Sequence, residues 1–463
     1  MTNPLDTRED SSKKFIFIKM KWKPTQQKPI TLNLKHQRKR IVMDKRTFFK
    51  HSIAMGLGAP ALFNTLEKLN LTVANKSVEE IAEDENYWLG IRGGYRLKPD
   101  YINLENGYYC FMPQAILEDY LHHIREVNYQ GSHYMRTVQW DNKRAVCGQL
   151  ADLIQCDAEE IIITRNTTES LDTVIGGIHW EKGDEAIMAN QDYFAMIEHF
   201  RLCEERYGIV RKIVDVPNIP ISDEEIVAVY ENAITIKTKL IMVCHIVNIT
   251  GQILPIRKIC DMAHKKGVEV LVDGAHAIGH FAFDIKELHC DYYGSSLHKW
   301  LSAPLGAGLL YINKEKISGL WPMFGDFGYP LENIRRMNHT GTHPVATDLA
   351  IGNAIEYLHR IGLDKKEARL RYLQNYWTSR VRNEPNIIVN TPADPKRVCG
   401  IANVGIKNMK TSLMAENLLK KYRIWTVAID GQGVQGCRIV PNIYTTTREL
   451  DIFIKALKEM AKS

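Results

Sequence analysis

Val270-Leu271-Val272-Asp273-Gly274-Ala275-His276-Ala277, followed by Ser295-Ser296-Leu297-His298-Lys299-Trp300, is the part of the sequence that decides the fold. Its first half is an apolar run typical of a buried β-strand, and Asp-Gly ends that run with a turn signal. Its second half follows another short run of strand type at 291–294. Ligands bind at the carboxyl ends of strands in open α/β sheets, so both halves place polar side chains where a ligand would bind.

Patterns typical of strands and helices alternate on both sides of this region. Strands are expected at 161–164, 185–189, 209–216, 240–245, 268–272, 291–294 and 308–312. Helices are expected between most of them, at 168–179, 195–207, 223–233 and 257–265. This alternation predicts an α/β fold with a large, mostly parallel sheet flanked by helices.

The C-terminal part of the chain has a different pattern. Two helical segments, 347–361 and 365–381, precede a mixture of short strands and helices. That mixture predicts a smaller α+β domain. We therefore expect a basic tail and leader at 1–74, a large ligand-binding domain at 75–345 and a small C-terminal domain at 346–463.

Composition argues against several functional classes. The 463 residues are 45% hydrophobic and 25% charged, which is an ordinary globular balance. Residues 1–42 hold 11 Lys/Arg and 3 Asp/Glu, so the net charge of +6 comes from the N-terminal end and not from the body. A nucleic-acid-binding domain would need a basic face, and a membrane span would need roughly 18–20 apolar residues in a row, so neither is expected. The nine cysteines include no Cys-x-x-Cys pair, which indicates buried, reduced thiols, and we expect no metal site.

A second start and a leader are expected near Met43. The run Lys45-Arg46-Thr47-Phe48-Phe49-Lys50 is similar to a twin-arginine export signal, with Lys45 at the first arginine position. An apolar stretch follows, and Thr72-Val73-Ala74 could serve as the cleavage site. These features predict export to the periplasm. The alternative is an N-terminal helix that packs on the body of a cytoplasmic protein.

Hydroxyl, carboxylate and lysine groups, in this order along the chain, fit the chemistry of pyridoxal 5'-phosphate (PLP). A lysine amine, here Lys299, can hold the cofactor as a Schiff base and then move the Cα proton of an amino-acid substrate. A carboxylate, here Asp273, can keep the pyridine nitrogen protonated, so that the ring accepts electrons. Each feature alone is more common as an ordinary turn, helix cap or surface residue. Their order and spacing together indicate a PLP site.

The region 244–312 resembles the class V aminotransferase family, which has fold type I of PLP enzymes, and it is most similar to the isopenicillin-N epimerase-like subgroup. Lys299 follows Asp273 by 26 residues, the spacing usual in that family. The similarity extends from Tyr101 to the C-terminus. It implies a PLP-dependent transferase-like fold of type I, PLP as the cofactor and a small amino-acid-type substrate.

The resemblance also implies roles for individual residues. Asn166, Thr167 and Thr168 match the phosphate-binding turn, and Asn248 and His276 match residues beside the cofactor O3' atom. Ser296, His298 and Lys299 match the Schiff-base motif. Further expected contacts are Tyr193 stacked on the cofactor ring, with Phe194 as the alternative, Arg438 on the substrate carboxylate, Asn106 and Gly107 at the substrate site, and Thr342 on the phosphate of a partner subunit in a homodimer with shared active sites.

The reaction is less constrained than the cofactor. A cysteine desulfurase needs a mobile cysteine before the carboxylate arginine, but the expected loop 428–436 contains none. Cys437 adjoins Arg438 on an expected strand and would lack freedom to move. A Cα reaction through Lys299, either aminotransfer or epimerisation, is therefore the main hypothesis. The first alternative is a PLP-dependent C–S lyase, which would work by β-elimination as in sulfoxide lyases or, in second place, as a cysteine desulfurase. A non-catalytic binding protein is the minor alternative.

Overall fold

The structure is a computed structural model, and it describes residues 59–462, with side chains from residue 64 onward. The basic tail and the export motif at 45–50 lie outside the described residues. The described part of the expected leader is helix α2 (Ala59–Thr72), which contacts α5 and α13. Leu66 on this helix and Val73 just after it are both 2% exposed. The described part of α2 therefore packs on the body of the molecule.

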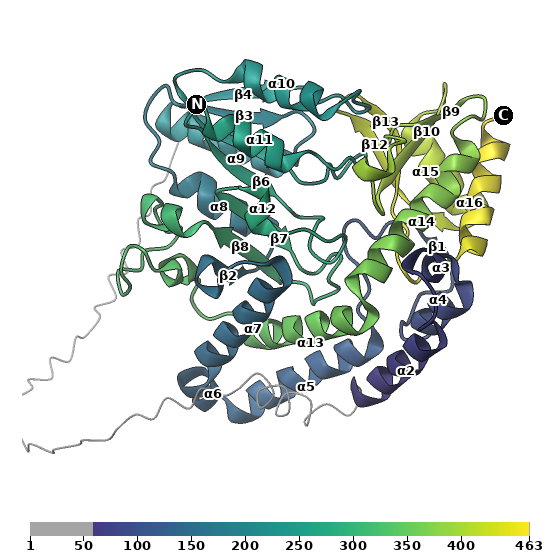
Figure 1. The fold of residues 1–463 in the computed structure, drawn as a ribbon, viewed down its shortest axis with the longest axis horizontal. Coiled ribbons are helices and arrows are strands. Elements are labelled where there is room, and N and C mark those ends of the chain that lie inside the picture. The colour runs from purple at the N-terminus through teal and green to yellow at the C-terminus, as the bar shows by residue number, and fades with distance from the viewer. Residues whose placement is uncertain (1–58, 463) are drawn as a thin grey trace, which may run out of the picture. The chain divides into compact units, whose positions relative to one another are not determined.

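A seven-stranded sheet forms the centre of the larger part of the molecule (Figure 1). The strand order is β2-β8-β7-β6-β5-β3-β4, and β8 is the strand that runs opposite to the other six. This confirms the predicted α/β fold with a mostly parallel sheet. The strands are β2 (Ile161–Thr164), β3 (Glu185–Ala189), β4 (Val210–Val214), β5 (Thr238–Cys244), β6 (Glu269–Asp273), β7 (Tyr292–Ser296) and β8 (Gly308–Ile312).

Helices cover both faces of this sheet, because side chains of both faces are apolar. In β5, Leu240 and Met242 belong to one hydrophobic cluster, while Ile241 and Val243 belong to another. Successive strand residues point to opposite faces, so the two clusters mark the two sides of the sheet. The helices of this part are α5 (Gln114–Gln130), α6 (Ser132–Thr137), α7 (Gln139–Ile154), α8 (Thr167–Gly177), α9 (Phe194–Tyr207), α10 (Asp223–Ala233), α11 (Ile256–His264), α12 (Ile285–Leu288) and α13 (Val345–Ile361).

A smaller antiparallel sheet of order β12-β13-β10-β9 carries the C-terminal part. The region 428–436, expected to be a loop, is instead a hairpin of β12 and β13. This sheet has a hydrophobic cluster of its own. Its elements are β9 (Ile387–Val389), β10 (Ala402–Ile406), β11 (Ile424–Trp425), β12 (Val427–Gly431), β13 (Val434–Ile439), α14 (Leu363–Val381), α15 (Thr411–Tyr422) and α16 (Thr447–Met460).

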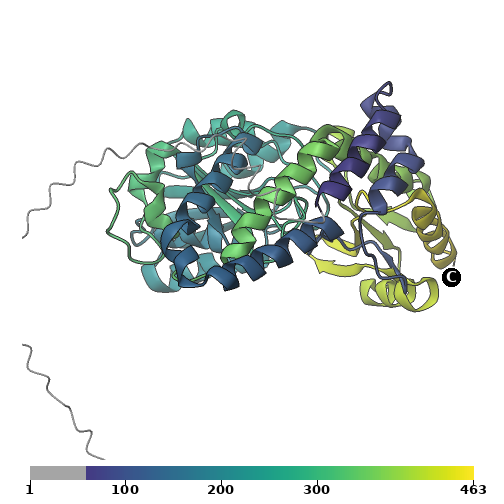
Figure 2. The same cartoon turned by 90° about the horizontal axis from the view of Figure 1, so that it is seen from below.

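The segment that precedes the large sheet joins this smaller part. Strand β1 (Ile102–Asn103) pairs in parallel with β11, and helix α3 (Val78–Glu83) packs on α14. Helix α4 (Glu85–Arg92) follows α3, and the two lie beside α14 and α16 in both ribbon views (Figures 1 and 2). The segment 78–103, expected in the large domain, therefore packs with the smaller part. Long-range pairing of this kind leaves no local signal in the sequence.

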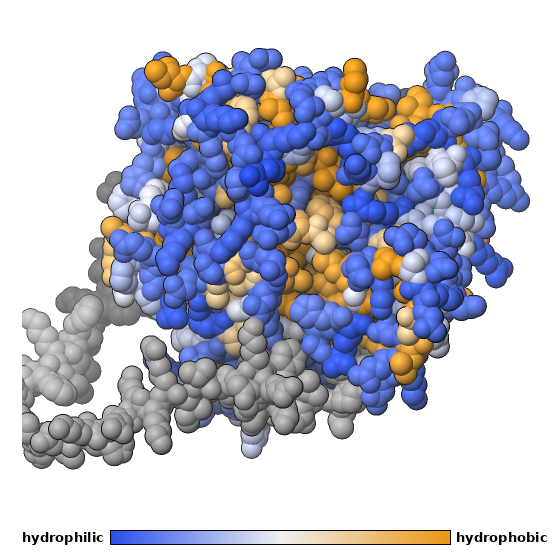
Figure 3. All heavy atoms as spheres, in the orientation of Figure 1, coloured by the Kyte–Doolittle hydropathy of each residue, from blue (hydrophilic) through white to orange (hydrophobic). Residues whose placement is uncertain are grey.

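The outer face of the molecule is mostly hydrophilic, and hydrophobic atoms gather in the middle of the view (Figure 3). No helix among residues 59–462 is long and apolar enough to cross a bilayer. All nine cysteines are free thiols; eight are buried and Cys156 is partly buried. The expectation of reduced, mostly buried thiols is confirmed.

Strands β6 and β7 approach closely where β6 ends. Gly274 donates its N–H to the Gly294 carbonyl at 2.8 Å and accepts from the Ser295 hydroxyl at 2.7 Å. A Cβ on Gly274 would overlap the ring of Tyr293. That ring is buried, and its hydroxyl lies 2.9 Å from His245 Nδ1, so it has little freedom to move. Only glycine fits this position.

We predict that Gly274→Ala lowers the free energy of unfolding by about 1–3 kcal/mol, the usual cost of overpacking a rigid core. Urea denaturation followed by circular dichroism measures it. Gly148→Ala, in the middle of α7 with nothing within 4 Å of its new Cβ, is the matched control and should be neutral or mildly stabilising. Equal stability of the two variants would contradict the steric argument.

Candidate active site

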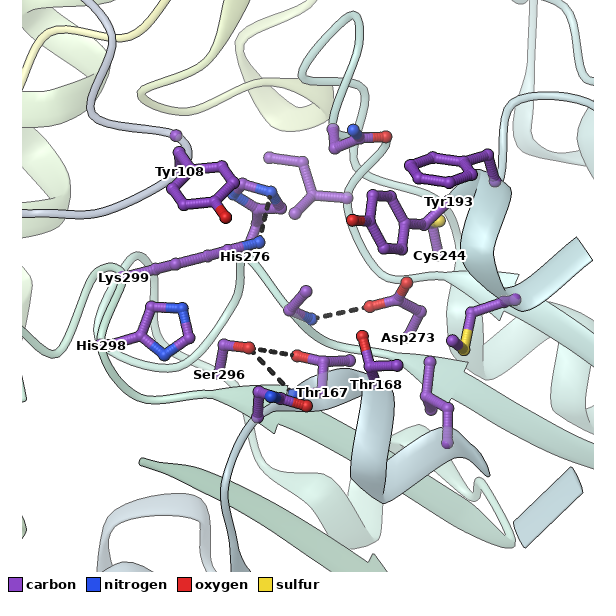
Figure 4. Close-up of a pocket in the computed structure, with 18 of the residues that line it drawn as sticks. Tyr108, Thr167, Thr168, Tyr193, Cys244, Asp273, His276, Ser296, His298 and Lys299 are labelled. Atoms are coloured by element: carbon purple, nitrogen blue, oxygen red, sulfur yellow. Dashed lines mark hydrogen bonds between the residues drawn. The ribbon is translucent and has the colours of Figure 1, made fainter. Parts of the chain in front are cut away.

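A cavity of about 520 Å³ opens at the carboxyl ends of the central strands (Figure 4). Its lining brings together residues from β5, β6, β7, the start of α8 and β13, which are far apart in the sequence. Twelve of the residues expected at the site line it: Gly107, Asn166, Thr167, Thr168, Tyr193, Asn248, Asp273, His276, Ser296, His298, Lys299 and Arg438.

Lys299 is held at the cavity by His276. Its Nζ atom lies 3.0 Å from His276 Nε2, and burial lowers the pKa of the amine to about 8. Trp300 Nε1–H donates to His276 Nδ1 at 3.3 Å. Burial also holds the pKa of His276 well below its usual value, so the ring is neutral. Because Nδ1 accepts from the indole, the ring proton lies on Nε2, where it can donate to the Lys299 amine in its deprotonated form.

A carboxylate lies across the cavity from this pair. Asp273 ends β6 and accepts from the Ala275 N–H at 2.9 Å. Burial raises its pKa, while the nearby Lys299 acts in the opposite direction. A cation beside this carboxylate would offset the cost of its burial.

Asp192 and Cys244 form a buried pair near Asp273 that sequence analysis missed. Cys244 Sγ lies 3.0 Å from Asp192 Oδ1, and the Ala189 N–H donates to the same carboxyl group at 2.8 Å. Burial raises the pKa of Asp192 to about 7. Asp192 immediately precedes Tyr193, and the backbone turn alone gives no sign that its side chain points inward.

The first turn of α8 forms a cradle for an anion. Asn166 caps this helix by accepting from the Glu169 N–H at 2.9 Å. Ser296 Oγ lies 2.7 Å from Thr167 Oγ1 and accepts from the Thr167 N–H at 3.0 Å, which joins the helix start to the end of β7. His298 Nδ1 is buried and has no hydrogen-bond partner among the described residues. The hydroxyls of Thr167 and Ser296, the first backbone N–H groups of α8 and the imidazole of His298 lie together at this point. Because helix N-termini attract anions, a phosphate can bind there.

Two aromatic rings close another side of the cavity. Tyr193 precedes α9 and lines the cavity, and Phe194 lies beside it with ring centroids 4.9 Å apart. Tyr193 is 39% exposed, whereas Phe194 is 63% exposed. The less exposed Tyr193 is the better candidate to cover a flat ligand.

Arg438 reaches the cavity from β13, but part of its guanidinium is already occupied. It forms a buried ion pair with Glu105, with Nη2 2.5 Å from Oε1 and Nε 3.2 Å from Oε2. Nη1 donates to the Asn248 carbonyl at 3.1 Å. A Cβ on Gly107 would lie 2.9 Å from Arg438 Cζ, so glycine allows the guanidinium to lie against this turn. Sequence analysis did not identify Glu105.

Two expected site residues lie outside the cavity lining of this chain. Asn106 is fully buried, donates to the Val440 carbonyl at 2.7 Å and accepts from the Tyr444 hydroxyl at 2.7 Å. Its side chain supports the turn and does not face a substrate. Thr342 is exposed and does not line the cavity.

The arrangement fits PLP. An amine with a lowered pKa, a buried carboxylate, an anion cradle with an unpartnered imidazole nitrogen and a covering aromatic ring surround one cavity of sufficient volume. Among the described residues, no group of three or more His, Cys, Asp or Glu side chains could hold a metal ion.

Known proteins show the same organisation. The profile of the family Aminotransferase class-V matches residues 112–453. Isopenicillin N epimerase of Streptomyces clavuligerus is 26% identical over 80% of this chain and 97% of its own length. Cysteine desulfurase of Klebsiella pneumoniae is 25% identical over 76% of this chain and 91% of its own length.

Among solved structures, the apo cysteine desulfurase of Thermococcus onnurineus superimposes with a TM-score of 0.71 at 21% identity, covering 80% of this chain and 97% of that one. At that identity the likeness concerns the fold alone, and it agrees with the large sheet and small C-terminal part described above. The family match spans most of the chain and includes the cavity-lining residues from Arg165 to Arg438. The chain therefore belongs to the aminotransferase class-V family, whose cofactor is pyridoxal 5'-phosphate.

Proposed function

We propose that this protein catalyses a reaction at the Cα atom of an amino-acid substrate, aminotransfer or epimerisation, with Lys299 as the catalytic residue. The observation that carries the proposal is the Lys299 amine, buried in the cavity, with its pKa lowered to about 8 and 3.0 Å from a neutral His276. An amine with such a pKa can both accept and return a proton near neutral pH. The similarity to isopenicillin N epimerase supports chemistry at Cα.

Each residue of the cavity has a separate task in this proposal. When bound, PLP withdraws electrons from the bond that breaks at Cα. Lys299 holds the cofactor and carries the Cα proton, and the imidazole of His276 orients the amine. Asp273 keeps the ring nitrogen protonated. Thr167, Ser296 and the first turn of α8 hold the phosphate, which the short contacts between them support.

The cysteines support a reaction without a thiol nucleophile. Cys437 is fully buried on β13, its Sγ lies 3.9 Å from the Thr411 carbonyl, and burial raises its pKa to about 11. Cys244, the cysteine that lines the cavity among the described residues, is tied to Asp192, and burial raises its pKa well above the usual value. A thiolate nucleophile needs the opposite conditions. β-Elimination of a sulfoxide-type substrate also needs no thiol, so it remains the alternative.

We further propose a homodimer in which Thr342 of one chain reaches the phosphate in its partner. Thr342 lies in an exposed segment. Upstream of it, Trp321, Phe324 and Phe327 are 53%, 46% and 88% exposed, which is unusual for large apolar side chains of a monomer. A second copy would cover such a surface.

Lys299→Ala should reduce turnover by at least about 100-fold, because one amine serves both cofactor attachment and proton transfer. Borohydride reduction of the wild-type holoenzyme, followed by peptide mapping, should place the pyridoxyl group on Lys299. Lys366 is an internal control, since it is also buried with a pKa near 8 but does not line the cavity. A label on Lys366 would refute the assignment.

Cys437→Ser should retain at least half of the wild-type activity. Wild type, this variant and Lys299→Ala would be incubated with L-cysteine and a panel of amino acids. Sulfide release, α-hydrogen exchange in D₂O and keto-acid formation would be followed together. We expect exchange of the α-hydrogen for deuterium, with or without formation of a keto acid. Sulfide release from L-cysteine that disappears in Cys437→Ser would instead establish desulfuration, and elimination products from a sulfoxide would favour the lyase.

Thr342→Val should weaken PLP retention by about 10-fold, which corresponds to the loss of one hydrogen bond to a charged group. This loss is measured by dialysing the holoenzyme and following the absorbance of the PLP that stays bound. Light scattering should give twice the chain mass for wild type and variant alike. A monomeric holoenzyme that retains PLP equally well in both forms would contradict the shared site.

A further inference from the structure

Glu105 occupies one edge of the arginine that the proposed function assigns to the substrate carboxylate. The contacts of 2.5 and 3.2 Å engage Arg438 Nη2 and Nε, which form one of the two forks of a guanidinium. The side chains of Arg438 and Glu105 are only 9% and 7% exposed. Arg438 lines the cavity, whereas Glu105 lies behind it. The positive charge at the substrate site is therefore matched by a carboxylate before any ligand binds.

Glu105 is held firmly in this position. Its Oε1 atom also accepts from the Tyr108 N–H at 3.1 Å, and its own N–H donates to Asn103 Oδ1 at 3.2 Å. Its backbone forms a parallel bridge with Val440, two residues after Arg438. A ligand that displaced Glu105 would leave a buried carboxylate without its partner, which is costly. Glu105 therefore stays in place when a ligand binds.

Arg438 still has N–H groups available on the other edge. A guanidinium carries five, and the contacts described above use one each on Nε, Nη2 and Nη1. One on Nη1 and one on Nη2 remain. These two N–H groups can donate to a ligand carboxylate while Glu105 stays bound, but Arg438 then lies between two negative charges.

We propose that Glu105 is a specificity-determining residue that weakens the hold of Arg438 on free carboxylates, so that only a carboxylate delivered with an amine on the same molecule is retained. This inference rests on the proposed amino-acid chemistry. When an amino acid is already held through its amine, its carboxylate is present at Arg438 at a high effective concentration. It therefore stays bound although the contact with Arg438 is weakened. Simple carboxylates lack that attachment and dissociate.

Two effects of Glu105→Gln oppose each other. The variant exchanges a charge-assisted contact that orients Arg438 for a neutral hydrogen bond, because the amide oxygen of glutamine can still accept from the guanidinium. It also removes the negative charge that opposes a second carboxylate on the free edge of Arg438. Since one hydrogen bond to Arg438 is kept while the repulsion is lost entirely, the second effect is the larger. We therefore expect tighter binding of free carboxylates by about 10-fold.

The experiment titrates holoenzyme with acetate by calorimetry, and with L-alanine by the change in cofactor absorption. Glu105→Gln should bind acetate about 10-fold more tightly than wild type and should bind L-alanine with a smaller gain. Glu105→Asp keeps the charge and should remain within about threefold of wild type for acetate. Arg438→Met should abolish the gain when combined with Glu105→Gln, which places the acetate at this arginine.

The outcomes separate the two proposals. Unchanged or weaker acetate binding in a folded Glu105→Gln variant would overturn the role of Glu105, even if L-alanine reacts. Failure of L-alanine and every other amino acid to alter the spectrum would overturn the proposed function, whereas the acetate comparison would still report on Glu105. If Glu105→Gln and Glu105→Ala both failed to fold, Glu105 would be a structural residue and the inference would be wrong.

Discussion

The burial of the Lys299 amine is the constraint on which the rest of the site depends. An ammonium group in a cavity with little water is costly, so burial lowers its pKa to about 8 and leaves a substantial neutral fraction. That neutral amine needs a donor, and His276 can supply one only as the Nε2–H tautomer. The indole of Trp300 sets this tautomer by donating to Nδ1. The protonation state of Lys299 and the tautomer of His276 are therefore linked.

Groups of opposite charge are arranged in a similar way at both ends of the cavity. Asp273 and Lys299 lie across the cavity from each other and influence each other's charge, whereas Glu105 forms a buried ion pair with Arg438. Groups of opposite sign therefore face each other at both ends before a ligand enters. An amino-acid substrate and a phosphorylated cofactor then bring further charges into the cavity. Each of these charges can lie beside a group of opposite sign, so that none is buried without a partner.

The charged residues of the cavity come from both parts of the molecule. The large sheet supplies Asp273 and Lys299 from neighbouring strand ends, because parallel strands end at one edge. The small sheet supplies Arg438 from β13, and the N-terminal segment supplies Glu105 through its bridge to Val440. The cavity therefore lies where segments from the N-terminal and C-terminal parts of the described chain meet.

The sequence by itself determined the sheet, the order of its strands along the chain and most of the cavity lining. These features depend on local periodicity and on motifs at strand ends, which short stretches encode. Only the tertiary structure decided that 428–436 is a hairpin, that Asn106 turns inward and that Glu105 faces Arg438 across 333 residues. Such contacts follow from how distant segments pack, and no spacing rule within one stretch can reveal which distant charge a buried side chain will meet.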